Sequence, residues 1–468
     1  MNSIKKHIPE IIALTGALFI IAFFIWAFSQ HGTIGLFRVN GFFNTVFIIF
    51  AIFGLILLGL GLLYLWIKIR KNTTGVKWFS VLIIVISIPA IIIPPVAFSV
   101  LGGIFSPEYI DTPPQLLLTN DTGDYGIPDM AVYFTTADAV SGSTMTWGDA
   151  NNSLTMTEDV KTREHLFIMN DLKPDARYHY RVNDEQIAYF STPSIDGQLR
   201  FAIASDAHYG SPNSRNDLTE KMLYEIANPD NGFDMFFFLG DLVEYGFNNN
   251  EWDEAFRSLN TATSIIPTRY APGNHDTLFC GLDSYLNYCA PEGLDTKTES
   301  RLWYRIDAGN VHFLVLDLEW SAEAYTKAQA EWFEQQLKDI PEDDWTIILS
   351  HGFYYASGIY AFGWEWYDNA ETINSITPLF NEYNVDLVCS GHAHNVELLK
   401  ENGITYAVCG AFGCLPDPGR TYTSPASIWY TDNQSALLDI AIAGDQCSLT
   451  FRDPDFEALY TITFDKNR

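Results

Sequence analysis

From residue 199 onward, short apolar strands alternate with helical segments, and this alternation limits the fold more than any other feature of the chain. The expected strands are Phe201–Ser205, Phe233–Leu239, Val311–Leu316, Trp345–Leu349 and Val385–Cys389, and the expected helices are Leu218–Ala227, Trp252–Leu259, Ala328–Leu337 and Ile373–Tyr383. Strands that lack a polar face need a sheet that is covered on both sides. The sequence therefore predicts an α/β domain over residues 198–468.

Metal-ligating side chains follow five of the strands in this domain. In chain order they are Asp206, His208, Asp241, Asn274, His275, Asp276, His351, His392 and His394. Strand ends at one edge of a sheet converge, so we expect these side chains to share one cleft. Eight of the ten histidines lie beyond residue 104, and five of those eight are in these motifs, which chance placement does not explain.

This ligand set suits two metal ions rather than one. Carboxylates, imidazoles and an amide are ligands for Zn, Mn or Fe. The seven expected ligands are Asp206, His208, Asp241, Asn274, His351, His392 and His394. Two ions about 3.5–4 Å apart can bind a bridging hydroxide and hold a phosphoryl group for in-line displacement. We therefore predict phosphate-ester hydrolysis by metal-hydroxide attack, and monoester, diester and pyrophosphate substrates all remain open.

The order D-x-H, G-D, G-N-H-D, H, G-H-x-H resembles the calcineurin-like metallophosphoesterase superfamily over about residues 199–400. The resemblance implies a four-layer α/β/β/α sandwich with a dinuclear site. It implies a first metal held by Asp206, His208, Asp241 and His394, and a second held by Asp241, Asn274, His351 and His392. It also implies that His275 stabilises the transition state or protonates the leaving group, and that Asp276 orients His275.

Residues 112–195 predict a separate β-sandwich, because short alternating strands recur between turns. The segment Leu172–Val182 resembles the signature of fibronectin type III-like domains, and such a domain ahead of the catalytic one resembles purple acid phosphatases. Those enzymes have a Tyr three residues after the bridging Asp, where this chain has Glu244. This departure argues against a purple ferric site, and Tyr245 is one position away.

Residues 1–105 carry three apolar runs, Ile11 to Phe28, Phe42 to Ile67 and Phe79 to Phe105, each close to the roughly 20 residues that cross a bilayer. A signal peptide would be an alternative for the first run, but no small-residue cleavage site follows it. Lysines and arginines flank the runs in a pattern that predicts a three-span membrane anchor in contact with the lipid bilayer. It places the catalytic domain on the extracytoplasmic side.

Charge narrows the function classes. The formal net charge is -30, and residues 105–468 carry 56 acids and 20 bases, a net of -36. A nucleic-acid binder that works through basic patches is excluded on this ground, because phosphate backbones would be repelled. The leading hypothesis is a membrane-anchored phosphoesterase, and the alternative is a membrane receptor or adhesion protein with a metal-containing binding domain. The His275–Asp276 pair disfavours the alternative, because binding alone needs no general acid.

The loop after His351 is rich in aromatic residues: Phe353, Tyr354, Tyr355, Tyr360, Phe362, Trp364, Trp366 and Tyr367. They could stack on a base or an aromatic leaving group, rest on lipid headgroups, or pack locally within a long loop. The sequence leaves these alternatives open.

Overall fold

The structure, a computed structural model, describes residues 109–467 apart from 196–197, 279–280, 296, 299, 362–363 and 418. Apart from Leu278 and Gly281, these residues form one compact unit. The predicted three-span anchor falls on residues 1–105 and so lies outside the described residues.

The predicted fold class and localisation need correction. Among the residues that the structure describes, no helix is both long and apolar enough to cross a membrane. The described residues form a β-sandwich joined to a larger α/β domain, and none of their helices corresponds to the predicted transmembrane α-helical anchor. For the residues that the structure describes, this finding contradicts the prediction of a multi-pass membrane protein with an extracytoplasmic catalytic domain.

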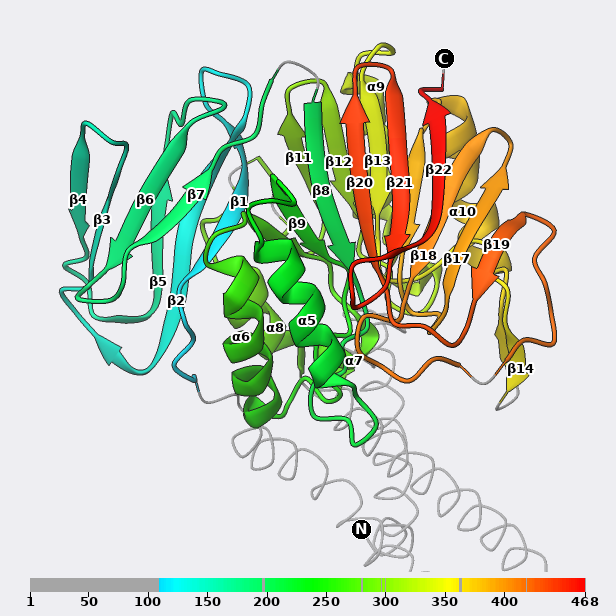
Figure 1. Ribbon diagram of the computed structural model, residues 1–468, viewed down its shortest axis with the longest axis horizontal. Helices are drawn as coiled ribbons and strands as arrows, with labels where there is room; N and C mark the ends of the chain where they lie inside the picture. The colour runs from blue at the N-terminus through cyan, green and yellow to red at the C-terminus, as the bar shows by residue number, and fades with distance from the viewer. Residues whose placement is uncertain are drawn as a thin grey trace, which may run out of the picture. The chain divides into compact units, whose positions relative to one another are not determined.

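The larger of the two main sheets has nine strands in the order β22-β21-β20-β8-β9-β10-β1-β2-β5. Their bounds are β1 Gln115–Thr122, β2 Pro128–Val140, β5 Thr162–Met169, β8 Gln198–Ala204, β9 Met235–Phe238, β10 Thr268–Tyr270, β20 Leu437–Ala443, β21 Gln446–Arg452 and β22 Ala458–Asp465. Strands β8, β9, β10 and β1 run parallel, and the strands on either side of them are antiparallel. The three C-terminal strands complete this sheet beside β8 (Figure 1).

The second main sheet has seven strands in the order β11-β12-β13-β16-β18-β17-β19. Their bounds are β11 Tyr304–Ala308, β12 Val311–Val315, β13 Trp345–Leu349, β16 Leu387–Ser390, β17 Val396–Glu401, β18 Ile404–Cys409 and β19 Ser427–Thr431. A small hairpin of β14 (Ile359–Ala361) and β15 (Trp364–Trp366) lies in the aromatic loop after His351. The sequence suggested only a loop in this segment.

Helices cover the outer face of each sheet (Figure 1). Helices α5 (Asn216–Ala227), α6 (Asn249–Thr263) and α8 (Gly281–Cys289) pack on the nine-stranded sheet, and α9 (Lys327–Asp339) and α10 (Ala370–Glu382) pack on the seven-stranded sheet. The single turn α7 (Asn274–Thr277) and a 3-10 helix, η2 (Ala322–Ala324), lie in loops. This is the four-layer α/β/β/α arrangement that the motifs implied.

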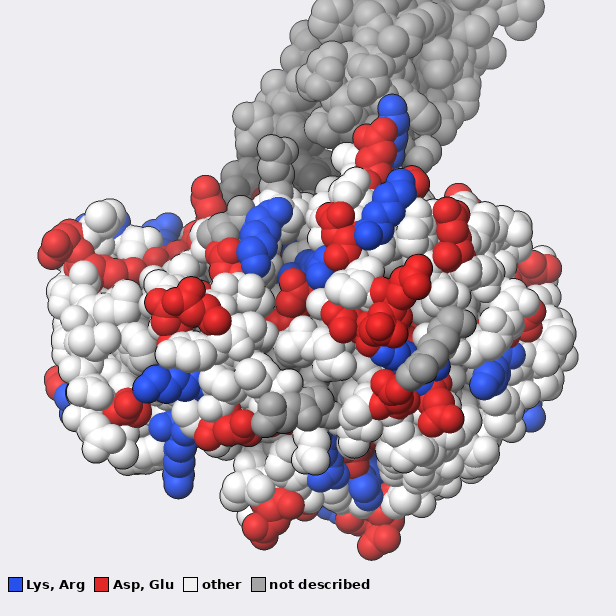
Figure 2. Space-filling view, turned by 90° about the horizontal axis from the view of Figure 1, so that it is seen from above, with Lys and Arg blue, Asp and Glu red and all other residues white. Residues whose placement is uncertain are grey.

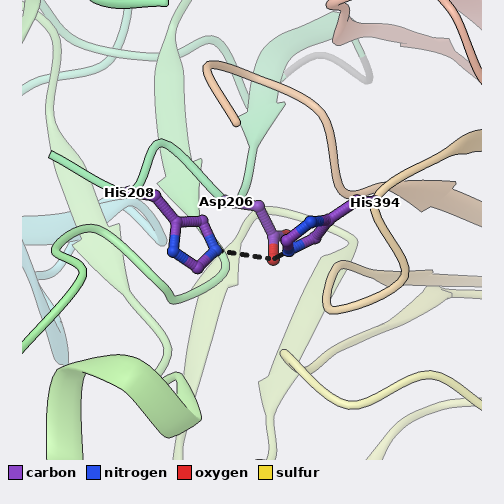
Figure 3. Close-up of side chains that lie close together, drawn as sticks. All are labelled: Asp206, His208 and His394. Carbon is purple, nitrogen blue, oxygen red and sulfur yellow. Dashed lines mark ion pairs between the residues drawn. The ribbon is translucent and has the colours of Figure 1, made fainter. Parts of the chain in front are cut away.

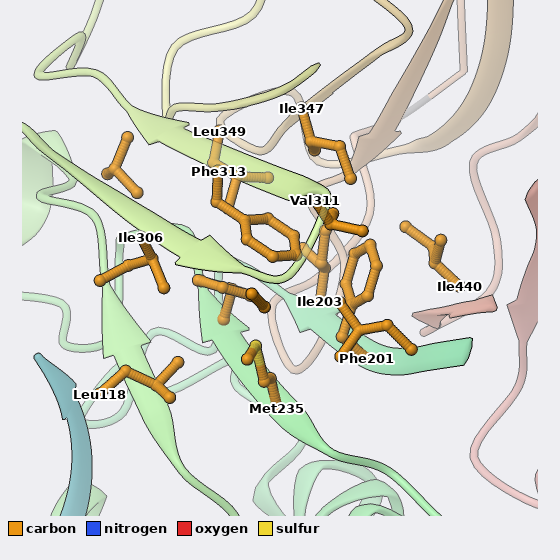
Figure 4. Close-up of a cluster of buried hydrophobic side chains, with 14 of the residues drawn as sticks. Leu118, Phe201, Ile203, Met235, Ile306, Val311, Phe313, Ile347, Leu349 and Ile440 are labelled. Atoms are coloured by element: carbon orange, nitrogen blue, oxygen red, sulfur yellow. The ribbon is translucent and has the colours of Figure 1, made fainter. Parts of the chain in front are cut away.

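The main core lies between the two sheets (Figure 4). Successive side chains of a strand point to opposite faces. Phe201 and Ile203 of β8 therefore meet Phe313 of β12 in this core, while Ala202 and Ala204 face the helices. Burial on both faces explains why the strands read as unbroken apolar runs.

The N-terminal module shares a sheet with the catalytic layers. Its strands β3 (Thr144–Gly148), β4 (Ser153–Thr157), β6 (Arg177–Val182) and β7 (Ala188–Ser191) form a four-stranded sheet. Strands β1, β2 and β5 instead extend the nine-stranded sheet, because β1 pairs in parallel with β10 at Leu117 and Thr268. The boundary at residue 198 and the fibronectin type III likeness remain predictions.

Figure 2 shows how charged side chains are distributed on one face of the molecule. On the face drawn in Figure 2, Asp and Glu side chains alternate with Lys and Arg and no broad basic area is visible. This view agrees with the argument from composition against nucleic-acid binding.

Candidate metal centre

The predicted ligands meet at one edge of the paired sheets. Asp206 and His208 follow β8, Asp241 follows β9, and Asn274 follows β10, all from the nine-stranded sheet. His351 follows β13, and His392 and His394 follow β16, both from the seven-stranded sheet. Each of these strands runs parallel to a neighbour, so their carboxyl ends lie at the same edge. The expected convergence is therefore what the structure shows.

Asp206, His208 and His394 form the first group (Figure 3). Oδ1 of Asp206 lies 3.5 Å from Nε2 of His394 and 3.8 Å from Nε2 of His208. Nε2 of His208 also lies 3.5 Å from Oδ2 of Asp241. These atoms are spaced as donors around a common point.

Asp241, His351 and His392 form the second group. Nε2 of His351 lies 3.3 Å from Oδ2 of Asp241, 3.2 Å from Nδ1 of His392 and 3.0 Å from Oδ1 of Asn274. The other ring nitrogen of His351 binds the carbonyl of Leu239 at 2.8 Å, which turns Nε2 toward the group. Oδ2 of Asp241 lies close to His208 of the first group as well as to His351 of the second, so its carboxylate is placed to serve both groups.

Backbone strain marks the same residues. Asp206, His208, Asp241 and His392 have φ of 61°, 50°, 53° and 65°, in the left-handed region that non-glycine residues seldom occupy. Such strain costs about 1–3 kcal/mol per residue and persists where function requires it. A Cβ at Gly273 would overlap the backbone nitrogen and the carboxylate of Asp241, so only glycine allows this approach.

Unpartnered buried atoms test whether metals fit. Oδ1 of Asp206, Nε2 of His208 and Nδ2 of Asn274 are buried without a hydrogen-bond partner among the described residues. An unpaired buried polar atom is costly, so its presence asks for an explanation. For Asp206 and His208, the unpaired atoms are the ones aimed at the first group, and ligation by a metal ion would satisfy them. The donor set fits two ions, although it does not name the metal.

His275 lies beside the first group rather than within the predicted ligand set. Its ring centroid is 4.6 Å from that of His208. Its backbone N–H donates to Oδ1 of Asp241 at 2.8 Å, and its Nδ1 lies 2.8 Å from the carbonyl oxygen of Glu244. This contact engages Nδ1 and leaves Nε2 as the other ring nitrogen that can carry a proton.

Asp276 has a different place from the one that the resemblance implied. Its carboxylate accepts backbone N–H groups of Asp241, Leu242, Val243 and Gly273 at 2.8–3.2 Å. It therefore holds the loop that carries the shared carboxylate. The ring of His275 is oriented by the Glu244 carbonyl instead.

Glu244 makes a contact that the sequence did not predict. Its Oε2 accepts from Nδ1 of His208 at 2.9 Å, which points Nε2 of His208 into the first group. A carboxylate behind a ligating histidine fixes the tautomer and raises ligand basicity. The spacing G-D-x-x-E was visible in the sequence, but its meaning depended on where His208 pointed.

Electrostatics at this edge favour positive charge. Burial alone would lower the pKa of His208, but the neighbouring carboxylates of Asp206 and Glu244 raise it to about 10. Burial likewise opposes protonation of His351, yet the charges of Asp241 and Asp206 raise its pKa to about 9. His392 behaves oppositely, since burial lowers its pKa to about 3 and keeps the ring neutral. Carboxylates that stabilise imidazolium here would also attract metal cations.

The two facing sheets, with Asp, Asn and His at the carboxyl ends of their strands, define a metallophosphoesterase class of fold. The sequence model of the calcineurin-like phosphoesterase family matches residues 199–396. The chain therefore carries a calcineurin-like metallophosphoesterase domain, and its homologues are purple acid phosphatases.

Three relatives illustrate the similarity. Purple acid phosphatase 21 of Arabidopsis thaliana is 24% identical over 50% of this chain and 53% of its own. A purple acid phosphatase of Glycine max is 25% identical over 64% of this chain and 65% of its own. A solved purple acid phosphatase from yellow lupin (Lupinus luteus) seeds has a TM-score of 0.62 at 19% identity, covering 76% of this chain and 74% of that one, which shows the fold. The chain spans about half the length of the curated relatives it matches first.

Proposed function

We propose that this chain hydrolyses phosphate esters at a dinuclear metal centre. The observation that carries the proposal is the set of unpartnered buried atoms of Asp206 and His208 at the point where strands of both sheets end. The first ion would be held by Asp206, His208, Asp241 and His394, and the second by Asp241, Asn274, His351 and His392. Zn, Mn and Fe all suit these donors.

Bound ions would supply Lewis acidity and lower the pKa of a coordinated water. The chain supplies the rest of the chemistry. Asp241 touches both groups and fixes their separation, because Asp276 pins its backbone. The strained backbone at Asp206 and His392 aims their side chains before any substrate arrives. Preorganisation of this kind avoids a reorganisation cost during the reaction.

His275 is the proposed proton donor to the leaving alkoxide. Its Nδ1 is engaged by the Glu244 carbonyl, so the proton is delivered from Nε2. A positioned general acid contributes about 10²–10⁴-fold to rate. This role distinguishes an enzyme from a metal-containing binding domain.

Relatives support the reaction class. Besides the purple acid phosphatases, a phosphoenolpyruvate phosphatase of Allium cepa is 25% identical over 70% of this chain. Other relatives are named probable inactive purple acid phosphatases, so similarity to this group does not by itself establish activity. Here all seven proposed ligands and His275 are in place.

We infer a centre without a tyrosinate ligand. The position where purple acid phosphatases have tyrosine holds Glu244, whose carboxylate is bonded to His208. Tyr245 has 41% of its surface exposed and its backbone N–H donates to Glu251. Iron-loaded protein should therefore lack an intense visible charge-transfer band.

The test is hydrolysis by the full chain loaded with Zn, Mn or Fe, using p-nitrophenyl phosphate, its bis-ester and pyrophosphate. His275→Ala should retain both ions by elemental analysis and lose about 10²–10⁴-fold in kcat. His179→Ala, in β6 of the N-terminal module, is the matched control and should change neither. Hydrolysis of none of these substrates by the metal-loaded protein, measured as release of p-nitrophenol or phosphate, would favour the binding-domain alternative.

A further inference from the structure

Three aromatic side chains surround the ring of His392, a proposed ligand of the second metal. The ring centroids of Trp320, Trp366 and Phe353 lie 5.3, 5.6 and 5.8 Å from it. Trp320 and Trp366 also contact each other, with centroids 6.2 Å apart and planes tilted by 58°. We call these two residues the tryptophan pair.

The pair comes from separate segments that are each held firmly. The backbone N–H of Trp320 donates to Glu323 at 2.9 Å, and its carbonyl accepts from the side chain of Asn369 at 3.2 Å. Trp366 ends β15, where it pairs with Ile359 of β14. A Cβ at Gly358 would overlap the carbonyl oxygen of Trp366, so the close approach of the hairpin depends on that glycine. Both indoles are therefore positioned before a ligand binds.

Exposure separates the pair from its buried neighbours. His392 is 7% exposed and Phe353 is 3% exposed, so their rings belong to the interior. Trp320 and Trp366 are only half-buried. If their sole role were to shield His392, any large apolar side chain would serve. Half-buried indoles beside a metal ligand instead offer π surface within reach of a bound ester.

Given the proposed function, on which this step rests, we propose that the tryptophan pair is a substrate subsite for phosphate esters that carry a flat ring, either an aryl group or a nucleobase. A flat ring can stack on indole whatever its exact substituents. Attraction of this kind does not depend on charge, which suits a strongly acidic protein, because only the phosphoryl end then needs the metals. Esters with an aliphatic group would bind through the phosphoryl end alone.

Binding without turnover gives the first test. Phenylphosphonate and methylphosphonate share the phosphoryl end and differ in the ring, and calorimetry on the metal-loaded chain measures both. Loss of a base–aromatic stack costs about fivefold in affinity or more. We expect the parent protein to prefer phenylphosphonate by at least about fivefold, and Trp320→Leu with Trp366→Leu to remove that preference while metal content stays at two ions.

Matched variants distinguish stacking of a substrate ring on the indoles from shielding of His392 by apolar side chains. Trp320→Phe with Trp366→Phe retains rings and should keep most of the preference, whereas leucine retains only apolar bulk. Trp332→Leu makes the same change on the half-buried face of α9 and should leave the preference intact. Equal preference in the parent and the leucine variant would overturn the proposal.

Steady-state kinetics with four phosphate esters shows whether the subsite takes a nucleobase or an aryl group. KM for adenosine monophosphate and for phenyl phosphate should each rise by about fivefold or more in the leucine variant, while KM for ribose 5-phosphate and glycerol phosphate stays within about twofold. A rise for only one of the ring-bearing esters assigns the subsite to a nucleobase or to an aryl group. Parallel changes for all four esters would refute the subsite yet leave the phosphoesterase function standing, and hydrolysis of none would refute the function itself.

Discussion

Removal of the Glu244 carboxylate should weaken the first metal and spare the second. The bond from Nδ1 of His208 to Oε2 of Glu244 is 2.9 Å long, and the Glu244 side chain is only 20% exposed. A hydrogen bond to a charged partner contributes about 1.5–3 kcal/mol, equivalent to about 10- to 150-fold in an equilibrium constant. We expect Glu244→Ala to lose about 10- to 100-fold in affinity for the first ion, as outer partners of metal ligands do. Glu244→Gln, which keeps a neutral acceptor, should lose about tenfold.

Metal-buffered titration followed by elemental analysis measures this effect directly. At limiting free metal, the parent protein should hold two ions and Glu244→Ala one. The Glu244 carbonyl that orients His275 is part of the backbone and survives both substitutions. Hence kcat at saturating metal should stay within several-fold of the parent value. Glu254→Gln on α6 removes the same charge, its partner being Asn216, and should not change metal content.

Two results would refute this reasoning. Equal loss of both ions would show that Glu244 supports the whole edge of the sheet rather than His208. Unchanged affinity for both ions would show that the 2.9 Å contact does not orient the ligand.

Three further outcomes are expected. Gly273→Ala places a methyl group against Asp241, so the free energy of unfolding, measured by thermal unfolding, should fall by about 1–3 kcal/mol. The metal content should fall as well. A normal metal content would contradict the close approach of Gly273 to Asp241. Burial raises the pKa of Asp386 from 3.8 to about 6, so the folded state binds this proton more tightly than the unfolded state does. The stabilisation from the bound proton is fully present below about pH 4 and is lost as the pH rises through about 6. Asp386→Asn should remove roughly 2 kcal/mol of that pH dependence between pH 4.5 and 7.5 in urea unfolding, and an unchanged slope would disprove it. Asp295→Ala leaves the guanidinium of Arg269 buried without its bidentate partner, so chemical denaturation should show a loss of about 3–5 kcal/mol, and a loss below 1 kcal/mol would argue against a buried pair.

Much of the catalytic layer could be predicted because its strands are buried on both faces. Phe233–Leu239 and Trp345–Leu349 were recognisable as strands from apolar residues alone, and the structure confirms β9 and β13. Strand β1 was not among the expected strands although Leu116–Leu118 is apolar, and its parallel partner β10 lies about 150 residues away along the chain. The hairpin β14–β15 was missed because each of its strands is only three residues long.

The amino-acid sequence by itself determined which residues could bind metal and at which strand ends they would stand. It did so because the donor atoms are fixed by residue type, and because the ends of parallel strands must share an edge. Only the tertiary structure decided which atoms face which. In the structure, Glu244 is hydrogen-bonded to His208, and Asp276 is hydrogen-bonded to the backbone around Asp241. The tryptophan pair lies against the ring of His392. These contacts join segments far apart in the chain, and their geometry depends on how two sheets and their loops pack, which local sequence patterns do not encode.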